Sequence, residues 1–182
     1  MSKIHLVRHG KAAAGFGAHP DPGLDDTGRA QARAVAELLQ DQGPMPVYSS
    51  PLARAYETAE MLANLWRVDI TIEPRVAEIP SPTDDLAERA AWLADAMQGS
   101  WEDLGDQHQD WLAAIGECLR EQAEDCVMFS HYVAINAAVG VATDDPRMRI
   151  FGPDNCSVTT IENTGGALSV VALGHTATTK IN

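Results

Sequence analysis

Apolar positions along the chain fall into two patterns, short continuous runs and longer segments with helical spacing. The short runs predict buried strands at residues 4–7, 47–49, 69–73 and 126–129. The longer segments repeat their apolar residues along one helix face, which predicts helices between the strands. Their expected ranges are 27–39, 50–65, 84–97, 107–122 and 132–141.

Capping and turn-forming residues mark the ends of several of these helices. Thr27 is expected to cap the first helix, and Gly43 with Pro44 to end it. Ser50 is expected to cap the second helix, with Pro51 at its first position. The apolar stripe expected on the first helix consists of Ala30, Ala34, Val35, Leu38 and Leu39.

Strands that alternate with helices predict an α/β protein with a mainly parallel sheet. Two further β-rich runs, 156–162 and 168–173, flank the turn sequence Asn163-Thr164-Gly165-Gly166, which indicates a hairpin and at least one antiparallel strand. The expected fold class is therefore α/β, a three-layer α/β/α sandwich with a mainly parallel central sheet and a C-terminal β-hairpin. The length of 182 residues suits a single domain over 1–182.

The charge balance limits the partners that this protein is expected to have. The formal net charge is −13 and the sequence pI about 4.7. An acidic surface repels nucleic acids and anionic membranes, so neither is an expected partner. Because no apolar run has the length of a signal peptide core or a membrane helix, a cytoplasmic location is expected by default.

Cysteine and histidine spacing gives no sign of a disulfide framework or a metal site. The three cysteines, Cys118, Cys126 and Cys156, have no paired spacing and are expected to be buried thiols. Histidines and carboxylates do not cluster at ligand spacing, so no metal and no cofactor are expected. No catalytic role is expected for four other histidines, because none of them directly follows a predicted strand. They are His5, His19, His108 and His175.

Cationic and nucleophilic side chains follow three of the predicted strands. Arg8 and His9 follow the first strand, Arg54 comes shortly after the second, and His131 follows the strand at 126–129. The carboxyl ends of strands in an open α/β sheet face a common crevice in which ligands bind. These four side chains are therefore expected to meet, although they are far apart in sequence.

Two arginines and two histidines suit the chemistry of a phosphoryl group. The guanidinium fork matches phosphate oxygens and keeps its charge. A neutral imidazole is a competent nucleophile near pH 7. Gly10 would let the backbone turn and approach the ligand closely.

Four segments in order along the chain carry a resemblance to a known family. They are Arg8-His9-Gly10, Leu24-Asp25-Asp26-Thr27-Gly28-Arg29-Ala30-Gln31-Ala32, Ser49-Ser50-Pro51-Leu52-Ala53-Arg54-Ala55-Tyr56-Glu57-Thr58-Ala59, and Ser130-His131. Together they resemble the histidine phosphatase superfamily with its phosphoglycerate mutase-like fold, and the segment Ala12-Ala13-Ala14-Gly15 resembles its short phosphatase branch. The resemblance implies that His9 becomes phosphorylated and that Arg8, Arg54 and His131 bind the phosphate.

The same resemblance implies an acid that protonates the leaving oxygen. Glu78, just after the third strand, is the best-placed candidate, with Asp84 and Asp85 as alternatives. Its pKa should be raised by burial, because the group must be protonated to act. Lys11 could add a third cation at the pocket mouth or point to solvent. Tyr132 could contact the substrate or pack on the core.

Three functions remain open at this point. The leading one is a metal-independent phosphatase acting on a small phosphomonoester or a phosphoprotein through phosphorylated His9. The enzyme alternative is a phosphoglycerate-type mutase, which would transfer the group, and the family's mutases are usually longer. The third is a protein that binds a phosphorylated ligand without turnover. Neither the natural substrate nor the oligomeric state follows from the sequence.

Overall fold

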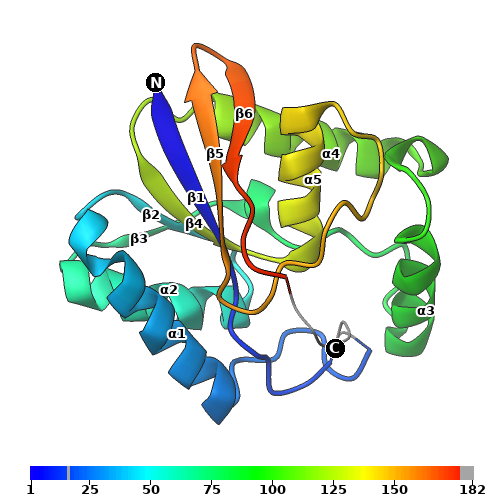
Figure 1. Ribbon diagram of the computed structural model, residues 1–182. Coiled ribbons are helices and arrows are strands. Elements are labelled where there is room, and N and C mark those ends of the chain that lie inside the picture. The colour runs from blue at the N-terminus through cyan, green and yellow to red at the C-terminus, as the bar shows by residue number, and fades with distance from the viewer. Residues whose placement is uncertain (16, 177–182) are drawn as a thin grey trace.

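A mixed sheet forms the middle layer of the protein, shown in Figure 1 as a computed structural model. The structure describes residues 1–15 and 17–176. Residue 16 and residues 177–182, at the end of the expected domain, lie outside the described residues. The strands are β1 (Ser2–Arg8), β2 (Val47–Ser49), β3 (Ile70–Ile72), β4 (Cys126–Ser130), β5 (Val158–Thr164) and β6 (Ala167–Ala172).

The strand order is β3-β2-β4-β1-β5-β6. Strands β3, β2, β4 and β1 pair in parallel, whereas β5 runs antiparallel to β1 and to β6. Gly165 and Gly166 turn the β5–β6 hairpin with φ of 62° and 93°, conformations that glycine adopts without strain. The expected α/β class, the mainly parallel sheet and the C-terminal hairpin are confirmed.

Helices cover both faces of the sheet (Figure 1). Helices α1 and α2 lie on one face, and α4 and α5 on the other, while α3 stands at the side of the molecule. A separate hydrophobic core fills each face. The helices are α1 (Asp26–Leu39), α2 (Ala53–Trp66), α3 (Leu86–Ala96), α4 (Asp106–Arg120) and α5 (Tyr132–Thr143), with short 3₁₀ helices at Gln40–Gln42, Pro74–Val76 and Trp101–Asp103.

The predicted start of α1 was wrong by two residues. Asp25, not Thr27, caps the helix, and its carboxylate accepts a hydrogen bond from the Gly28 N–H at 2.7 Å. The predicted stripe was also partly wrong, because Ala30, Ala34 and Leu38 are exposed. The helix instead buries Gly28, Ala32, Val35, Ala36 and Leu39.

The predicted cap of α2 was wrong as well. The helix begins at Ala53, after Pro51, and Leu52 occupies the cap position without a side-chain bond. The hydroxyl of Ser50 accepts from the Leu52 N–H in the preceding turn. Ser50 is fully buried, and its hydroxyl also lies 2.7 Å from Nε2 of His131.

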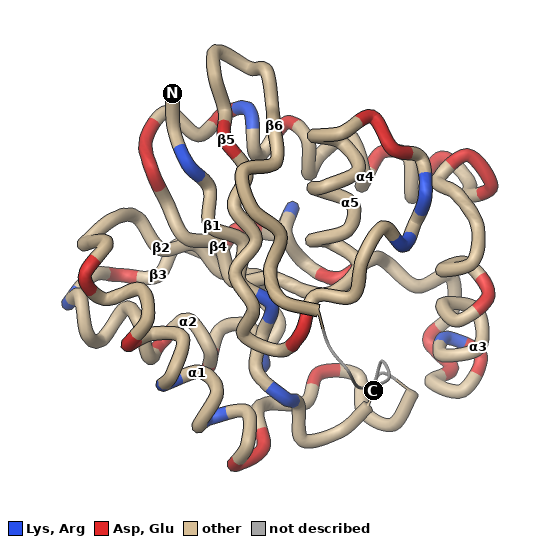
Figure 2. The backbone as a smooth tube through the Cα atoms, viewed as in Figure 1, with Lys and Arg blue, Asp and Glu red and all other residues tan. Residues whose placement is uncertain are grey.

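The three cysteines are free and buried, as expected. None of the helices in the described part of the chain is long and apolar enough to cross a membrane. Figure 2 shows acidic residues spread over the outer helices and loops. Arg8 and Arg54 depart from this pattern, because both are buried beside the carboxyl ends of the parallel strands.

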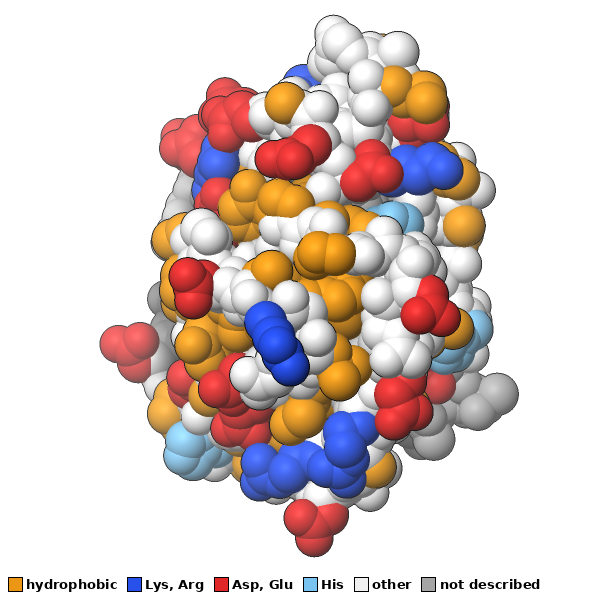
Figure 3. Space-filling view, turned by 90° about the vertical axis from the view of Figure 1, so that its left-hand side faces the viewer, with side chains coloured by type: hydrophobic (Ala, Val, Ile, Leu, Met, Phe, Trp, Pro, Cys, Tyr) orange, Lys and Arg blue, Asp and Glu red, His pale blue; other side chains and the backbone are white. Residues whose placement is uncertain are grey.

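Large hydrophobic side chains are exposed on α1, α2 and β3. They are Leu38, Tyr56, Leu65 and Ile72. Figure 3 views the molecule from this side and shows hydrophobic atoms bordered by acidic and basic ones. A mixed surface of this kind is normal for a globular protein.

Candidate active site

The residues that follow β1, β2 and β4 meet at one end of the sheet. The imidazole rings of His9 and His131 lie with their centroids 5.1 Å apart. The Nε–H of Arg54 donates to Nε2 of His9 at 3.2 Å. Parallel pairing of β2 and β1 with β4 brings these strand ends together, so the expected meeting of the four side chains follows from sheet topology.

The two ring nitrogens of His9 have partners of opposite kinds. Nδ1 lies 2.7 Å from the carbonyl oxygen of Gly10, which can only accept a hydrogen bond. Nε2 faces the Nε–H of Arg54, which can only donate. The neutral ring therefore carries its proton on Nδ1 and its lone pair on Nε2.

His9 is held neutral by its surroundings. Its pKa lies well below the ordinary 6.5, first because the ring is buried and then because Arg54 and Arg8 repel a positive charge on it. The backbone is fixed as well, since the His9 N–H donates to the Ser130 carbonyl and the His9 carbonyl accepts from the side-chain amide of Asn155. A lone pair on Nε2 is thus present in a fixed position near neutral pH.

Arg8 lies in a largely buried position beside Tyr132. One terminal N–H of its guanidinium donates to the Pro153 carbonyl at 2.9 Å, and the group lies 5.2 Å above the centroid of the Tyr132 ring. This arrangement is a cation–π contact. The Nε of Arg8 has no hydrogen-bond partner within the described residues.

His131 is fully buried and contacts Ser50. Its Nε2 lies 2.7 Å from the Ser50 hydroxyl, and its Nδ1 has no partner in the described part of the chain. Burial, followed by the charge of Arg54, lowers the pKa of His131 well below 6.5. His131 therefore presents a neutral ring beside His9, and an anion bound there would favour its protonation.

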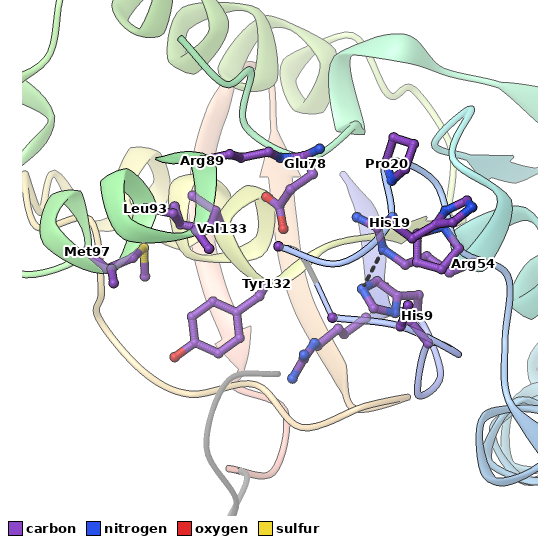
Figure 4. A pocket seen from close by; sticks show the side chains of 18 of the residues that line it. His9, His19, Pro20, Arg54, Glu78, Arg89, Leu93, Met97, Tyr132 and Val133 are labelled. Atoms are coloured by element: carbon purple, nitrogen blue, oxygen red, sulfur yellow. Dashed lines mark hydrogen bonds between the residues drawn. The ribbon is translucent and has the colours of Figure 1, made fainter. Parts of the chain in front are cut away.

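Glu78 lines the same pocket and is partly buried. Burial raises its pKa above the ordinary 4.5, while the hydrogen bond from the Ile79 N–H and the charges of Arg54 and Arg8 act in the opposite direction. Figure 4 shows the carboxyl group pointing into the cavity. The alternatives, Asp84 and Asp85, are not among the lining residues, and Asp85 caps α3 through the Ala87 and Glu88 N–H groups.

The cavity has a volume of about 440 Å³ and two unlike sides. Figure 4 shows His9 and Arg54 on one side and Leu93 and Met97 of α3 on the other, with Glu78 between them. The polar side carries the guanidinium and imidazole groups described above. The opposite side is mainly aliphatic.

Several pocket residues were not predicted by the sequence analysis, three cationic or imidazole side chains among them. Arg89, on α3, and Arg149, in the loop after α5, both line the cavity. His19 lines it too, although no site role was expected for it. No local pattern could have identified these residues, because their place depends on how α3 and two loops fold over the sheet edge.

The two possible substrate contacts have different surroundings. Tyr132 lines the pocket and is also buried in one of the two hydrophobic cores, and its contact with a substrate stays a prediction. Lys11 is not among the lining residues. Its ammonium group forms an ion pair with Asp25 at 3.0 Å at the surface, and the structure does not bring it to the pocket.

Gly10 and Gly28 form a close backbone approach between the strand end and α1. A Cβ on Gly10 would lie 2.5 Å from the Gly28 carbonyl oxygen, and a Cβ on Gly28 would lie 2.1 Å from the Lys11 carbonyl oxygen. Gly10 does not have a positive φ. Position 10 therefore requires glycine because of this close approach to α1, and not because of a positive φ in a turn.

Comparison with known proteins adds family relationships to this geometry. A family model described as "Histidine phosphatase superfamily (branch 1)" matches residues 4–176. The chain is 26% identical over 188 aligned residues to "Probable phosphoglycerate mutase GpmB" of Serratia proteamaculans, and the match covers 90% of this chain and 86% of that protein. A protein of the same name from Enterobacter sp. is 27% identical, with 89% and 85% covered.

Solved structures share the fold at lower identity. A mycobacterial glucosyl-3-phosphoglycerate phosphatase in complex with VO3 has a TM-score of 0.72 and 19% identity, with 95% of this chain and 99% of that chain covered. A phosphoserine phosphatase from Entamoeba histolytica in complex with 3-phosphoglyceric acid has a TM-score of 0.72 and 21% identity, with 97% and 98% covered. These likenesses confirm the phosphoglycerate mutase-like fold.

Proposed function

This chain belongs to the histidine phosphatase superfamily (branch 1), and on that premise we propose that it is a metal-independent phosphatase with His9 as its nucleophile. The substrate is a phosphomonoester, free or on a protein. Arg8, Arg54 and His131 bind the phosphate oxygens, and Glu78 protonates the leaving oxygen. The observation that carries the proposal is the buried lone pair on Nε2 of His9, directed at Arg54 in a cavity lined by further cations.

In the first step, Nε2 of His9 attacks phosphorus and the bond to the ester oxygen breaks. Glu78 gives its proton to that oxygen, so the alcohol leaves neutral. Arg54 exchanges its hydrogen bond to His9 for one to a phosphate oxygen. The positive charge that develops on the ring is stabilised by the Gly10 carbonyl at Nδ1, and the charge on the phosphoryl oxygens by the arginines.

In the second step, water attacks phosphorus on the phosphorylated His9 and the phosphorus–nitrogen bond breaks. The carboxylate of Glu78 accepts the proton of the water, which returns the acid to its starting state. Inorganic phosphate leaves, and Nε2 regains its lone pair. The net reaction converts one ester and one water into one alcohol and one phosphate.

Turnover of p-nitrophenyl phosphate in excess EDTA tests this proposal. We expect phosphate release by the native chain and an acid-labile phosphoenzyme after rapid quenching, because a phosphorylated imidazole hydrolyses in acid. His9→Ala should lose both signals while keeping its thermal unfolding transition. A folded native chain that binds vanadate but neither turns over nor becomes labelled would instead indicate a protein that only binds phosphorylated ligands.

A phosphoglycerate-type mutase is the second candidate. It is favoured by Arg89 and Arg149, which add cations to the pocket beyond those assigned to the phosphate and could bind a carboxylate. The names of the 26–27% identical relatives agree with it. With 3-phosphoglycerate and a 2,3-bisphosphoglycerate primer, a mutase would yield 2-phosphoglycerate faster than inorganic phosphate, and a phosphatase would yield mainly phosphate.

A further inference from the structure

Helix α3 presents an aliphatic wall to the phosphate side of the pocket. Three of its lining residues, Ala90, Leu93 and Ala94, are apolar; Met97, at its C-terminal cap, and Val133 of α5 continue the wall. We call these five residues the apolar wall. Figure 4 shows Leu93, Met97 and Val133 grouped together, across the cavity from His9 and Arg54.

Two hydrogen-bonding groups beside the apolar wall are engaged within the protein. The side-chain amide nitrogen of Gln98 donates to the Ala94 carbonyl of its own helix. Nδ1 of His19 accepts from the Asp21 N–H. A leaving group with several hydroxyls would lose its hydration against the wall without regaining those hydrogen bonds, which is unfavourable.

The loop before α1 closes the cavity with further apolar groups. Ala12, Ala14, Pro20 and Pro22 line it. A cavity of about 440 Å³ is larger than a phosphoryl group needs and falls in the range of pockets that hold an organic group of moderate size. The space beyond the phosphate donors is therefore mainly apolar, with Arg89 and Arg149 also among its lining residues.

We propose that this enzyme acts on phosphomonoesters of hydrophobic alcohols, with the alkyl or aryl body of the leaving group packed on the apolar wall. The inference rests on the proposed function, because it takes the ester oxygen to lie between His9 and Glu78. It adds the substrate class: the group bonded to that oxygen is apolar, unlike glycerate or a sugar.

Two chain-length series test the substrate class. The first is kcat/KM for n-alkyl phosphates from ethyl to octyl, each below its micellar concentration, with 3-phosphoglycerate as the polar reference. The second is binding of the matching n-alkyl phosphonates, which cannot be hydrolysed, followed by calorimetry. We expect both kcat/KM and affinity to rise about two- to fourfold per methylene until the cavity is filled.

A matched pair of variants assigns the effect to the wall. Ala94→Asp places a charge on the pocket side of α3, whereas Ala91→Asp places the same charge on an exposed residue of that helix that does not line the pocket. We expect Ala94→Asp to reduce the octyl-to-ethyl ratio at least tenfold, and Ala91→Asp to leave it unchanged. Thermal unfolding of both variants checks that α3 is intact.

The outcomes separate this inference from the proposed function. Turnover through phosphorylated His9 without a chain-length effect, or with 3-phosphoglycerate preferred, would overturn the substrate class and leave the phosphatase in place. No turnover of any ester, but phosphonate affinity that rises with chain length and falls in Ala94→Asp, would support the apolar ligand class and reject the phosphatase. Phosphonate affinity that is independent of chain length would reject the inference whatever the turnover.

Discussion

At the scale of single residues, the site depends on two groups whose pKa values are shifted in opposite directions. Burial and the neighbouring arginines lower the pKa of His9, and burial raises the pKa of Glu78. The proposed reaction needs the neutral form of His9 and the acid form of Glu78. Both shifts therefore widen the pH range in which the two required forms coexist.

The pH dependence follows from these signs. For an n-alkyl phosphate we expect a bell-shaped profile of kcat/KM with an acidic optimum. On the acid side, activity should persist below pH 6.5 and fall only through the lowered pKa of His9; on the alkaline side, it should fall through the raised pKa of Glu78. Rates measured from about pH 4 to pH 9 check this. A single rise through pH 6.5 with no alkaline fall would contradict it.

The leaving group determines how much Glu78 contributes. We expect Glu78→Gln to lower kcat/KM for an alkyl phosphate by about 100-fold or more, since an alkoxide is a poor leaving group without a proton. For p-nitrophenyl phosphate the loss should stay below about tenfold, because the nitrophenolate leaves unaided.

Asp84→Asn and Asp85→Asn are the controls for that variant. Neither residue lines the pocket, and Asn keeps the capping ability of position 85. Both should retain native rates with the two substrates. An alkyl-specific loss in either variant, with Glu78→Gln unaffected, would assign the acid to that position instead.

At the scale of elements, α1 holds the catalytic strand end in place through glycine. Gly28 lies in the buried face of α1 against the backbone of Lys11, and Gly10 lies against Gly28. The Gly10 N–H also donates to the Thr58 hydroxyl of α2. The two helices of this face thus fix the loop that carries His9.

Gly28→Ala tests that support. Alanine favours helix formation, but its Cβ would lie 2.1 Å from the Lys11 carbonyl oxygen, so we expect a net loss of about 1–3 kcal/mol in the free energy of unfolding and a lower kcat. Gly105→Ala is the control without a steric clash, because a Cβ there meets nothing within 4 Å, and at this N-cap position of α4 we expect it to cost less than about 1 kcal/mol. Urea unfolding and kcat of both variants provide the comparison, and equal stability would refute the close-packing argument.

The element ends show how far local patterns can be used. Asp25, Asp26 and Thr27 can all cap a helix, and only the fold decides that Asp25 accepts from Gly28. The stripe of α1 was misplaced because its buried face begins with Gly28, which an apolar count leaves out. By contrast, the meeting of Arg8, His9 and His131 could be predicted, because Arg8 ends strand β1, His9 and His131 directly follow strands, and strand ends in a parallel sheet share one edge.

At the scale of the whole molecule, the site lies between parts of the protein that are buried to different extents. Each sheet face has its own core of buried side chains. In α5, every residue from Tyr132 to Gly140 is buried. The apolar wall belongs mainly to α3, which lies at the side of the molecule. Arg89 and Arg149 could not be assigned from sequence because they depend on this long-range arrangement.

The modest burial of α3 has a consequence for hydrogen exchange. Leu93 is the one buried residue within that helix, so α3 can detach in a local opening that costs much less than global unfolding. Its amides should exchange much faster than those of α5. An octyl phosphonate packed against α3 would raise the cost of that opening by about 2.7 kcal/mol at 100 times its Kd and slow exchange about 100-fold. If the α3 amides of the free protein exchange as slowly as those of α5, then α3 does not open locally. Ligands would in that case enter and leave the pocket without detachment of this helix.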